Sequence, residues 1–176
     1  MQYIHDFKIT VREYYQNGQS NDFPVFSICP MCNAHITLEK HGFYQRYAII
    51  SNKSYYIDIR RYYCSCCEKT LSILPSLLLP HFQYSLEVIM QCLKEFFQAK
   101  RNHIPFYRQL TEFYSRRFLK NIPRHISFFR DSTGPAVFST DKYNKAIKLL
   151  EMINSFPKET FAKRFFDHYL TSFMAV

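Results

Sequence analysis

Six cysteines are the residues whose type and spacing bear most directly on chemistry. Four of them form two identical pairs, Cys29-x2-Cys32 and Cys64-x2-Cys67, with 31 residues between the pairs. A C-x2-C turn lets two thiolates bind one tetrahedral ion at about 2.3 Å, so two such turns predict a closed site with four thiolate ligands. A catalytic zinc keeps one position open for water, and we therefore expect one structural zinc ion here.

Three further residues leave alternatives within this prediction. Cys66 lies inside the second pair and could replace Cys64 or Cys67, although the spacing of the first pair favours Cys64 and Cys67. His35 could replace one cysteine, but a histidine at a strand edge is more often structural than a ligand. Cys92 follows a helical pattern of apolar residues and is expected to pack in a core.

Positive charge is concentrated in the middle of the chain. The formal net charge is +9 and the pI is near 9.3, which indicates a polyanionic partner, nucleic acid before membrane. Residues 85–130 carry 9 Lys and Arg against 3 Asp and Glu, so two thirds of the net charge lies there. We therefore expect this region to bind double-stranded DNA.

The candidate DNA contacts are cations that can meet phosphates, together with one hydroxyl that can reach a base edge. They are Arg101, Arg108, Arg116, Arg117, Lys120, Arg124, Ser127 and Arg130, with Lys100 as a further cation. If Pro123 to Arg130 forms a recognition helix, Arg124, Ser127 and Arg130 lie within two turns of one another and face the major groove.

The elements that must position the cysteines read as β-strands. Residues 43–50 and 55–63 form two strands around a turn at 51–54, and residues 68–83, with Pro75 and Pro80, form an extended connector. The alternation predicts one face formed by Tyr55, Ile57, Ile59 and Tyr63, and an opposite face with Asp58 and Arg60. We expect a zinc β-ribbon that needs its metal to fold, because so small a unit buries little apolar surface.

Helices follow the strands. The first begins after Ser85, with Glu87 in its first turn, and the second runs from Pro105 to Phe113. A third begins at Pro123, and two more span Asp141 to Ile153 and Pro157 to Phe173. Residues 115–122 contain no glycine, so Arg108 to Lys120 could instead continue as one helix.

The predicted fold class is α+β, a small zinc ribbon followed by an all-α region of the helix-turn-helix type. We expect a lead-in segment at 1–24, the ribbon and its connector at 25–83, a basic helical region at 84–131 and a C-terminal helical pair at 132–176. No apolar run approaches the roughly 18–20 residues that span a bilayer. The N-terminus has acidic residues and no apolar signal core, which favours the cytoplasm.

Four runs of sequence resemble one known family. CPMC at 29–32, HGFYQR at 41–46, IRRYYCSCC at 59–67 and LPSLLLPHFQYSLEVI at 74–89 resemble the zinc-ribbon and helix-turn-helix N-terminal region of bacterial transposase-related proteins. The similarity covers residues 25–90. It implies zinc on Cys29, Cys32, Cys64 and Cys67, and DNA contact by the helices after Ser85.

These features bear on three classes of function, namely a DNA-binding protein, an enzyme and a protein-interaction module. We expect a non-catalytic DNA-binding protein, because the acidic residues after Arg130 lie on short helices and no HExxH motif or glycine-rich phosphate loop is present. No small-molecule substrate and no membrane partner are expected. The alternative is a protein-interaction module. The stripe Phe161, Phe165, Phe166, Tyr169, Leu170 and Phe173 would form a homodimer interface if other helices leave it uncovered, although core packing is the more frequent role.

Overall fold

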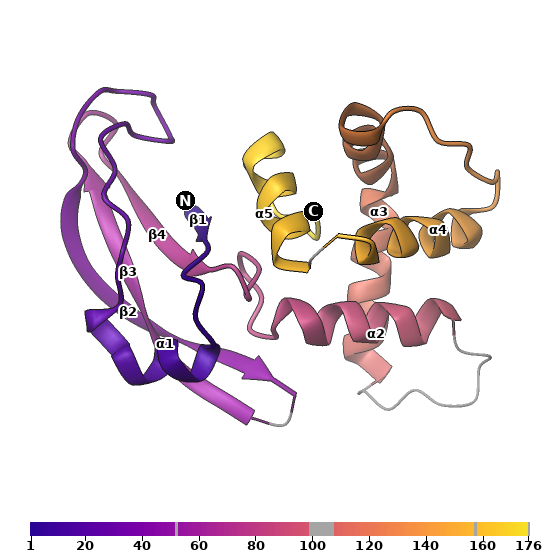
Figure 1. Cartoon of the computed structure of the whole chain (residues 1–176), viewed down its shortest axis with the longest axis horizontal. Coiled ribbons are helices and arrows are strands. Elements are labelled where there is room, and N and C mark those ends of the chain that lie inside the picture. The colour runs from indigo at the N-terminus through magenta and orange to yellow at the C-terminus, as the bar shows by residue number, and fades with distance from the viewer. Residues whose placement is uncertain (52, 99–107, 157, 176) are drawn as a thin grey trace. The chain divides into compact units, whose positions relative to one another are not determined.

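The computed structural model describes residues 1–51, 53–98, 108–156 and 158–175 (Figure 1). The chain divides into two compact units, Met1–Ser85 and Leu86–Val176, which we call unit 1 and unit 2. Unit 1 holds a four-stranded sheet and a short helix, and unit 2 is helical. The prediction of a mixed α+β protein is confirmed.

The sheet of unit 1 is larger than the expected two-stranded ribbon. It contains β1 (Gln2–His5), β2 (Glu39–Ile50), β3 (Lys53–Cys64) and β4 (Lys69–Pro75) in the order β1-β4-β3-β2. β2–β3 and β3–β4 are antiparallel, whereas β1 runs parallel to β4. The predicted hairpin is confirmed, with Tyr44 opposite Ile59, although Asn52 of its turn lies outside the described residues.

The two faces of the sheet pack against different clusters of side chains. Ile57 and Ile59 share one buried cluster with Tyr14, Ala48, Leu74 and Leu78. Tyr62 and Cys64 have the opposite parity in β3 and belong to a second cluster with Cys29, Leu38, Leu71 and Ile73. The buried tyrosine near the end of β3 is therefore Tyr62, whose hydroxyl donates to the Pro24 carbonyl at 2.7 Å, while Tyr63 is only half-buried.

Residues 1–24, expected as a lead-in segment, contribute regular structure. β1 adds an edge strand with Ile4 fully buried, and α1 (Val11–Asn17) follows. Thr10 and Glu13 form a capping box at the start of α1, in which Glu13 Oε2 accepts from the Thr10 backbone N–H at 2.8 Å. Tyr14 from this helix is buried, and its hydroxyl donates to the Asp58 carbonyl of β3 at 2.9 Å.

Unit 2 contains α2 (Leu86–Gln98), α3 (Arg108–Thr133), α4 (Lys142–Asn154) and α5 (Lys158–Tyr169). The predicted first helix is confirmed, since α2 begins directly after Ser85 and carries Glu87 in its first turn. The predicted helix near Asp141 is confirmed as α4, and the Asp141 side chain caps it by accepting from the Asn144 N–H at 2.8 Å.

The predicted break between a second helix and a recognition helix is wrong. α3 runs without interruption for 26 residues with Pro123 inside it, while the expected start at Pro105 lies outside the described residues. Buried residues recur at helical spacing on both sides of Pro123, among them Tyr114, Phe118, His125 and Phe129. Pro123 itself is exposed, so water can satisfy the carbonyl that loses its helical donor. The turn expected within residues 115–122 of the helix-turn-helix-like region at 84–131 is therefore replaced by one long helix, as in the alternative of a continuous helix over Arg108–Lys120.

The last helix ends earlier than predicted. α5 stops at Tyr169, and Leu170 follows with a φ of 52°, in the left-handed region that an ordinary helix does not visit. Its expected start at Pro157 lies outside the described residues. Phe161, Phe165 and Phe166 are buried, and so is Phe173 beyond the helix. The rings of Phe161, Phe165 and Phe173 contact residues of α3, for example Phe128 against Phe165 at a centroid distance of 5.2 Å. The four phenylalanines of the stripe are therefore core, as expected, whereas Leu170 is 56% exposed and Tyr169 is half-buried.

Candidate metal centre

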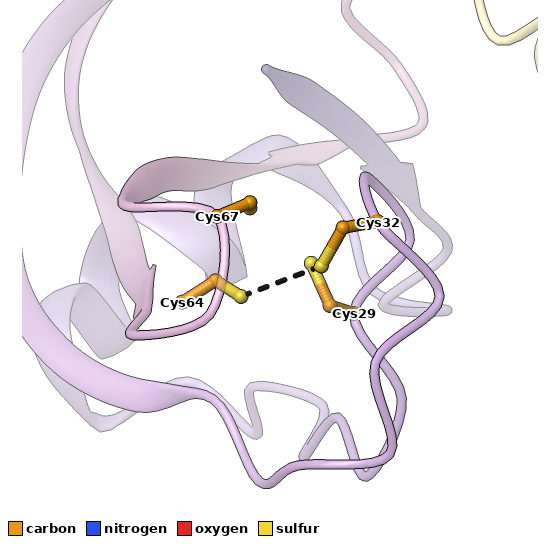
Figure 2. A group of neighbouring side chains, drawn as sticks. All are labelled: Cys29, Cys32, Cys64 and Cys67. Carbon is orange, nitrogen blue, oxygen red and sulfur yellow. Dashed lines mark hydrogen bonds between the residues drawn. The ribbon is translucent and has the colours of Figure 1, made fainter.

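The structure brings the four predicted ligands together. Cys29 and Cys32 lie in the loop before β2, Cys64 is the last residue of β3, and Cys67 lies in the turn to β4. Figure 2 shows the two pairs facing each other. All four Sγ atoms lie within 4.8 Å of one another, and the Sγ atoms of Cys32 and Cys64 are 3.8 Å apart. A tetrahedral ion with four sulfurs at about 2.3 Å has sulfur–sulfur distances of about 3.8 Å. The geometry therefore fits a four-thiolate metal site.

The backbone adopts the same local conformation around the two cysteine pairs. Each is followed by a residue in the left-handed region, Asn33 with a φ of 57° and Glu68 with a φ of 55°. In the first pair the Met31 N–H points at the Sγ of Cys29 at 3.4 Å. In the second pair backbone N–H groups of Cys66 and Cys67 likewise bond the sulfur of Cys64. This repeat places Cys64 and Cys67, and not Cys66, at the positions equivalent to Cys29 and Cys32.

The alternative ligands lie outside the group. Cys66 is exposed, and so is His35. Among the residues that the structure describes, neither joins the cluster of possible metal ligands. Cys92, expected to be a core residue, is buried in α2, and its Sγ lies 3.4 Å from the Thr111 hydroxyl. Core packing of Cys92 is thus confirmed.

The environment distinguishes the four thiols. Hydrogen bonds from the backbone, first that of Cys67, lower the pKa of Cys64 to about 7. Desolvation raises the pKa of Cys29 and raises that of Cys67 to about 12. Four thiolates at these separations repel one another strongly without a cation between them. A metal ion removes this repulsion, because a coordinating thiol is deprotonated outright.

The site is continuous with the apolar core of unit 1. Cys29 and Cys64 are fully buried and belong to the same cluster as Leu38, Tyr62 and Leu71, whereas Cys32 and Cys67 lie nearer to solvent. An ion bound here would join the loop before β2 to the turn between β3 and β4. These segments are more than thirty residues apart in sequence, so the ion would restrict the unfolded chain as a cross-link does.

The predicted DNA contacts that the structure describes lie on α3. Arg101, with Lys100, falls outside the described residues. The others occupy about half of the circumference of the helix at about 100° per residue, namely Arg108, Arg116, Arg117, Lys120, Arg124, Ser127 and Arg130. All are exposed except Arg117 and Ser127, which are half-buried. With Glu112 and Asp131 as its only acidic residues, α3 carries six cations and a formal charge of +4.

Several of these cations already have partners on the helix. Glu112 binds Arg108 at 3.0 Å and Arg116 at 3.4 Å. Arg130 lies 3.5 Å from Asp131 and donates to the Ser127 hydroxyl at 3.3 Å. These ion pairs are exposed, so each contributes only about 0–1 kcal/mol and can be exchanged for a phosphate.

Sequence reasoning overlooked two residues on the same surface. Gln109 and Phe113 lie beside Arg116 around a shallow hollow, and Phe113 is 44% exposed. The sequence could have indicated both residues, because they fall on the basic face when residues 108–133 form one helix. Ending the second predicted helix at Phe113 separated both residues from Arg116 and hid this relation.

Comparison with known proteins adds one finding. Residues 29–106 match the model of a domain of unknown function (DUF6431), and this region contains the cysteine pairs, strands β2 to β4 and α2. No curated protein and no solved structure matches the chain. In the described part of the chain, no helix combines the length and the apolar character needed to cross a membrane.

Proposed function

We propose that the chain is a non-catalytic DNA-binding protein related to transposases, with one structural zinc ion in unit 1 and a DNA-contacting surface on α3. The observation that carries the proposal is the cationic face of this helix. α3 is 26 residues long, or about 39 Å. Duplex DNA carries one negative charge per about 1.7 Å of its axis, so a helix of this length can meet several phosphates.

The charge distribution supports nucleic acid over other polyanions. Unit 1 carries 8 Lys and Arg against 6 Asp and Glu, whereas unit 2 carries 15 against 8. Six of the cations in unit 2 lie on α3, and five of these six are exposed along its length. An extended row of cations suits a backbone of regularly spaced phosphates.

Zinc is the proposed metal because of its ligands. Four cysteine sulfurs in tetrahedral arrangement select zinc or an iron–sulfur centre, and C-x2-C pairs on turns are typical of structural zinc. A site with four protein ligands leaves no open position for substrate. The ion would therefore stabilise unit 1 and take no part in a reaction.

The acidic residues of unit 2 support a non-catalytic role. Asp141 caps α4, Asp167 pairs with Lys163 at 2.8 Å, and Asp131 pairs with Arg130. These three carboxylates lie on different elements, and Asp131 also pairs with His168 of α5 at 3.7 Å. A nuclease core needs several carboxylates converging on a metal ion.

One observation favours a second candidate, a protein-interaction module. Tyr47 and Tyr56 face each other across β2 and β3 with ring centroids 4.8 Å apart, and each is about half exposed. Exposed tyrosine pairs of this kind are frequent in protein interfaces. This candidate predicts a mass in solution that rises with protein concentration and falls in a Tyr47→Ala variant.

Binding to random duplex DNA as a function of salt tests the proposal. The logarithm of the affinity should fall linearly with the logarithm of salt concentration, by about 0.9 per phosphate contact. The double variant Lys120→Gln with Arg124→Gln should reduce this slope by about 1.8. The matched control is Lys142→Gln with Lys145→Gln on α4, which removes the same charge and should leave the slope unchanged. The absence of binding at low salt, or equal slopes in the two variants, would overturn the proposal.

A further inference from the structure

The basic face of α3 contains one large apolar side chain. Phe113 is 44% exposed between charged residues, and it lines a shallow hollow on the helix. The residues that line the hollow are Gln109, Glu112, Phe113, Arg116 and Arg117. Contacts with phosphate do not need an exposed aromatic ring. The position of Phe113 on this cationic surface therefore suggests a different contact.

Neighbouring residues hold the ring in place. The guanidinium of Arg117 lies 4.6 Å from the centre of the Phe113 ring. Arg117 is itself anchored, because its Nη1 donates to the Met174 carbonyl at 3.4 Å. The Tyr114 ring, which is buried, lies edge-on at 5.5 Å. Phe113 is thus presented at a fixed position and does not swing freely on the surface.

Three chemically different groups form a narrow row here. Gln109, Phe113 and Arg116 follow one another at spacings of four and three residues, within about 60° of the helix circumference. They extend over about 10 Å of the helix axis, at about 1.5 Å per residue. An amide, an aromatic ring and a guanidinium are therefore presented side by side in the N-terminal half of α3.

These groups match the edges of bases in the major groove. A glutamine amide pairs with N6 and N7 of adenine, an arginine guanidinium pairs with O6 and N7 of guanine, and an aromatic ring contacts the methyl group of thymine. Lysine acts as a point charge, which suits a phosphate. The row thus presents groups that can contact base edges, and the cations further along α3 can contact the phosphates of the DNA backbone.

We propose that Gln109, Phe113 and Arg116 read base edges in the major groove of duplex DNA, while Lys120 and Arg124 contact the phosphate backbone. This inference rests on the proposed function and adds its specificity-determining residues. It places base recognition in the N-terminal half of α3. Arg124, Ser127 and Arg130, expected to read bases, lie in its C-terminal half.

Selection from a random duplex library tests the inference on the full chain. The wild type should enrich a preferred sequence. Gln109→Ala should weaken discrimination at one base position by about 5- to 150-fold, and Phe113→Ala should do so at a neighbouring position. Both variants should keep the affinity for random DNA within about threefold, and they should keep the salt slope, since neither removes a charge. Gln91→Ala, an exposed amide on α2, is the matched control and should keep the wild-type preference.

The outcomes separate the two proposals. If the wild type binds no duplex DNA at low salt, the proposed function fails and this inference fails with it. If the wild type binds with a steep salt slope but enriches no sequence, only the inference is overturned. The same holds if Gln109→Ala and Phe113→Ala keep the wild-type preference. A change of mass in solution for Phe113→Ala with unaltered preference would identify a protein interface and would also overturn it.

Discussion

Replacing Cys64 with serine removes one of the four sulfurs that converge on the candidate metal centre. Cys64 is fully buried and packs in the same apolar cluster as Tyr62 and Leu71. A serine hydroxyl is a poor ligand for zinc, so we expect the variant to bind little metal. The lost ion would release the first cysteine pair from the turn between β3 and β4.

The size of the effect follows from comparing two free energies. A domain gains roughly 0.05–0.15 kcal/mol of stability per residue, which gives about 4–13 kcal/mol for the 85 residues of unit 1. Binding of a structural zinc contributes about 10–16 kcal/mol of apparent folding free energy. Because the two ranges overlap, loss of the ion should remove most or all of the stability of unit 1.

Metal analysis and hydrogen exchange measure this prediction. The wild type should contain one zinc per chain, and Cys64→Ser should contain almost none. Amides of the sheet should lose protection in Cys64→Ser, while amides of α3 and α4 should keep most of theirs. Cys66→Ser is the matched control, because Cys66 lies in the same turn but is exposed and outside the cluster. It should retain both metal and protection.

Two results would refute the reasoning. One is a Cys64→Ser variant with a full complement of metal, which would mean that the ion is held by other residues. The other is a metal-free variant whose sheet keeps wild-type protection, which would mean that the apolar clusters of unit 1 are sufficient for folding. Equal metal loss in Cys66→Ser would reassign the ligand.

Three further predictions concern stability. The pKa of buried His125 is lowered to about 4 because burial disfavours the imidazolium. The unfolded state therefore binds more protons than the folded state below about pH 6.5, and the free energy of unfolding of unit 2 should fall by about 3 kcal/mol between pH 6.5 and pH 4. Denaturation at several pH values should show this fall, and His125→Gln should abolish most of the pH dependence. Glu68→Asn should raise the free energy of unfolding of unit 1 by up to about 1 kcal/mol, because asparagine tolerates a left-handed backbone better, and urea titration would show no change if the turn is unstrained. Phe165→Ala should lower the free energy of unfolding of unit 2 by about 3–5 kcal/mol, whereas Val137→Ala at an 87% exposed position should change it by under about 0.5 kcal/mol.

Sequence alone predicts those features whose causes are local. The spacing of the two cysteine pairs identifies the four clustered residues, because the two residues inside each pair form the turn that brings its two sulfurs together. The alternation of Ile57 and Ile59 with Asp58 predicts β3, and Asp141 predicts the start of α4. Each of these signals lies within a few residues of the feature it predicts.

The remaining parts of the fold depend on contacts distant in sequence. β1 has only four residues, and its partner β4 lies about seventy residues later, so nothing near Gln2 indicates a strand. Tyr62 is buried in place of Tyr63 because the segment around Pro24 covers that face of the sheet. α1 is different, since Thr10 and Glu13 form a capping box that the sequence does show.

The error in α3 has a particular cause. Pro123 suits the first turn of a helix, and it therefore predicts the start of one. The rows of buried residues before and after it keep the same helical phase, from Tyr114 and Phe118 to His125 and Phe129. This continuity outweighs one proline on the exposed side of the helix, whose cost is about 3 kcal/mol. Buried residues that keep one helical spacing across a proline therefore predict a continuous helix better than the proline predicts a break.

Chemical labelling of lysines in the presence of DNA tests the central claim most directly. Lys120 on α3 and Lys142 at the start of α4 are both exposed, so they react with an amine-specific reagent in the same molecule. If α3 is the DNA-binding surface, a saturating amount of duplex DNA should slow labelling of Lys120 severalfold and leave Lys142 nearly unchanged. Equal labelling of Lys120 with and without bound DNA, or stronger protection of Lys142, would contradict the account.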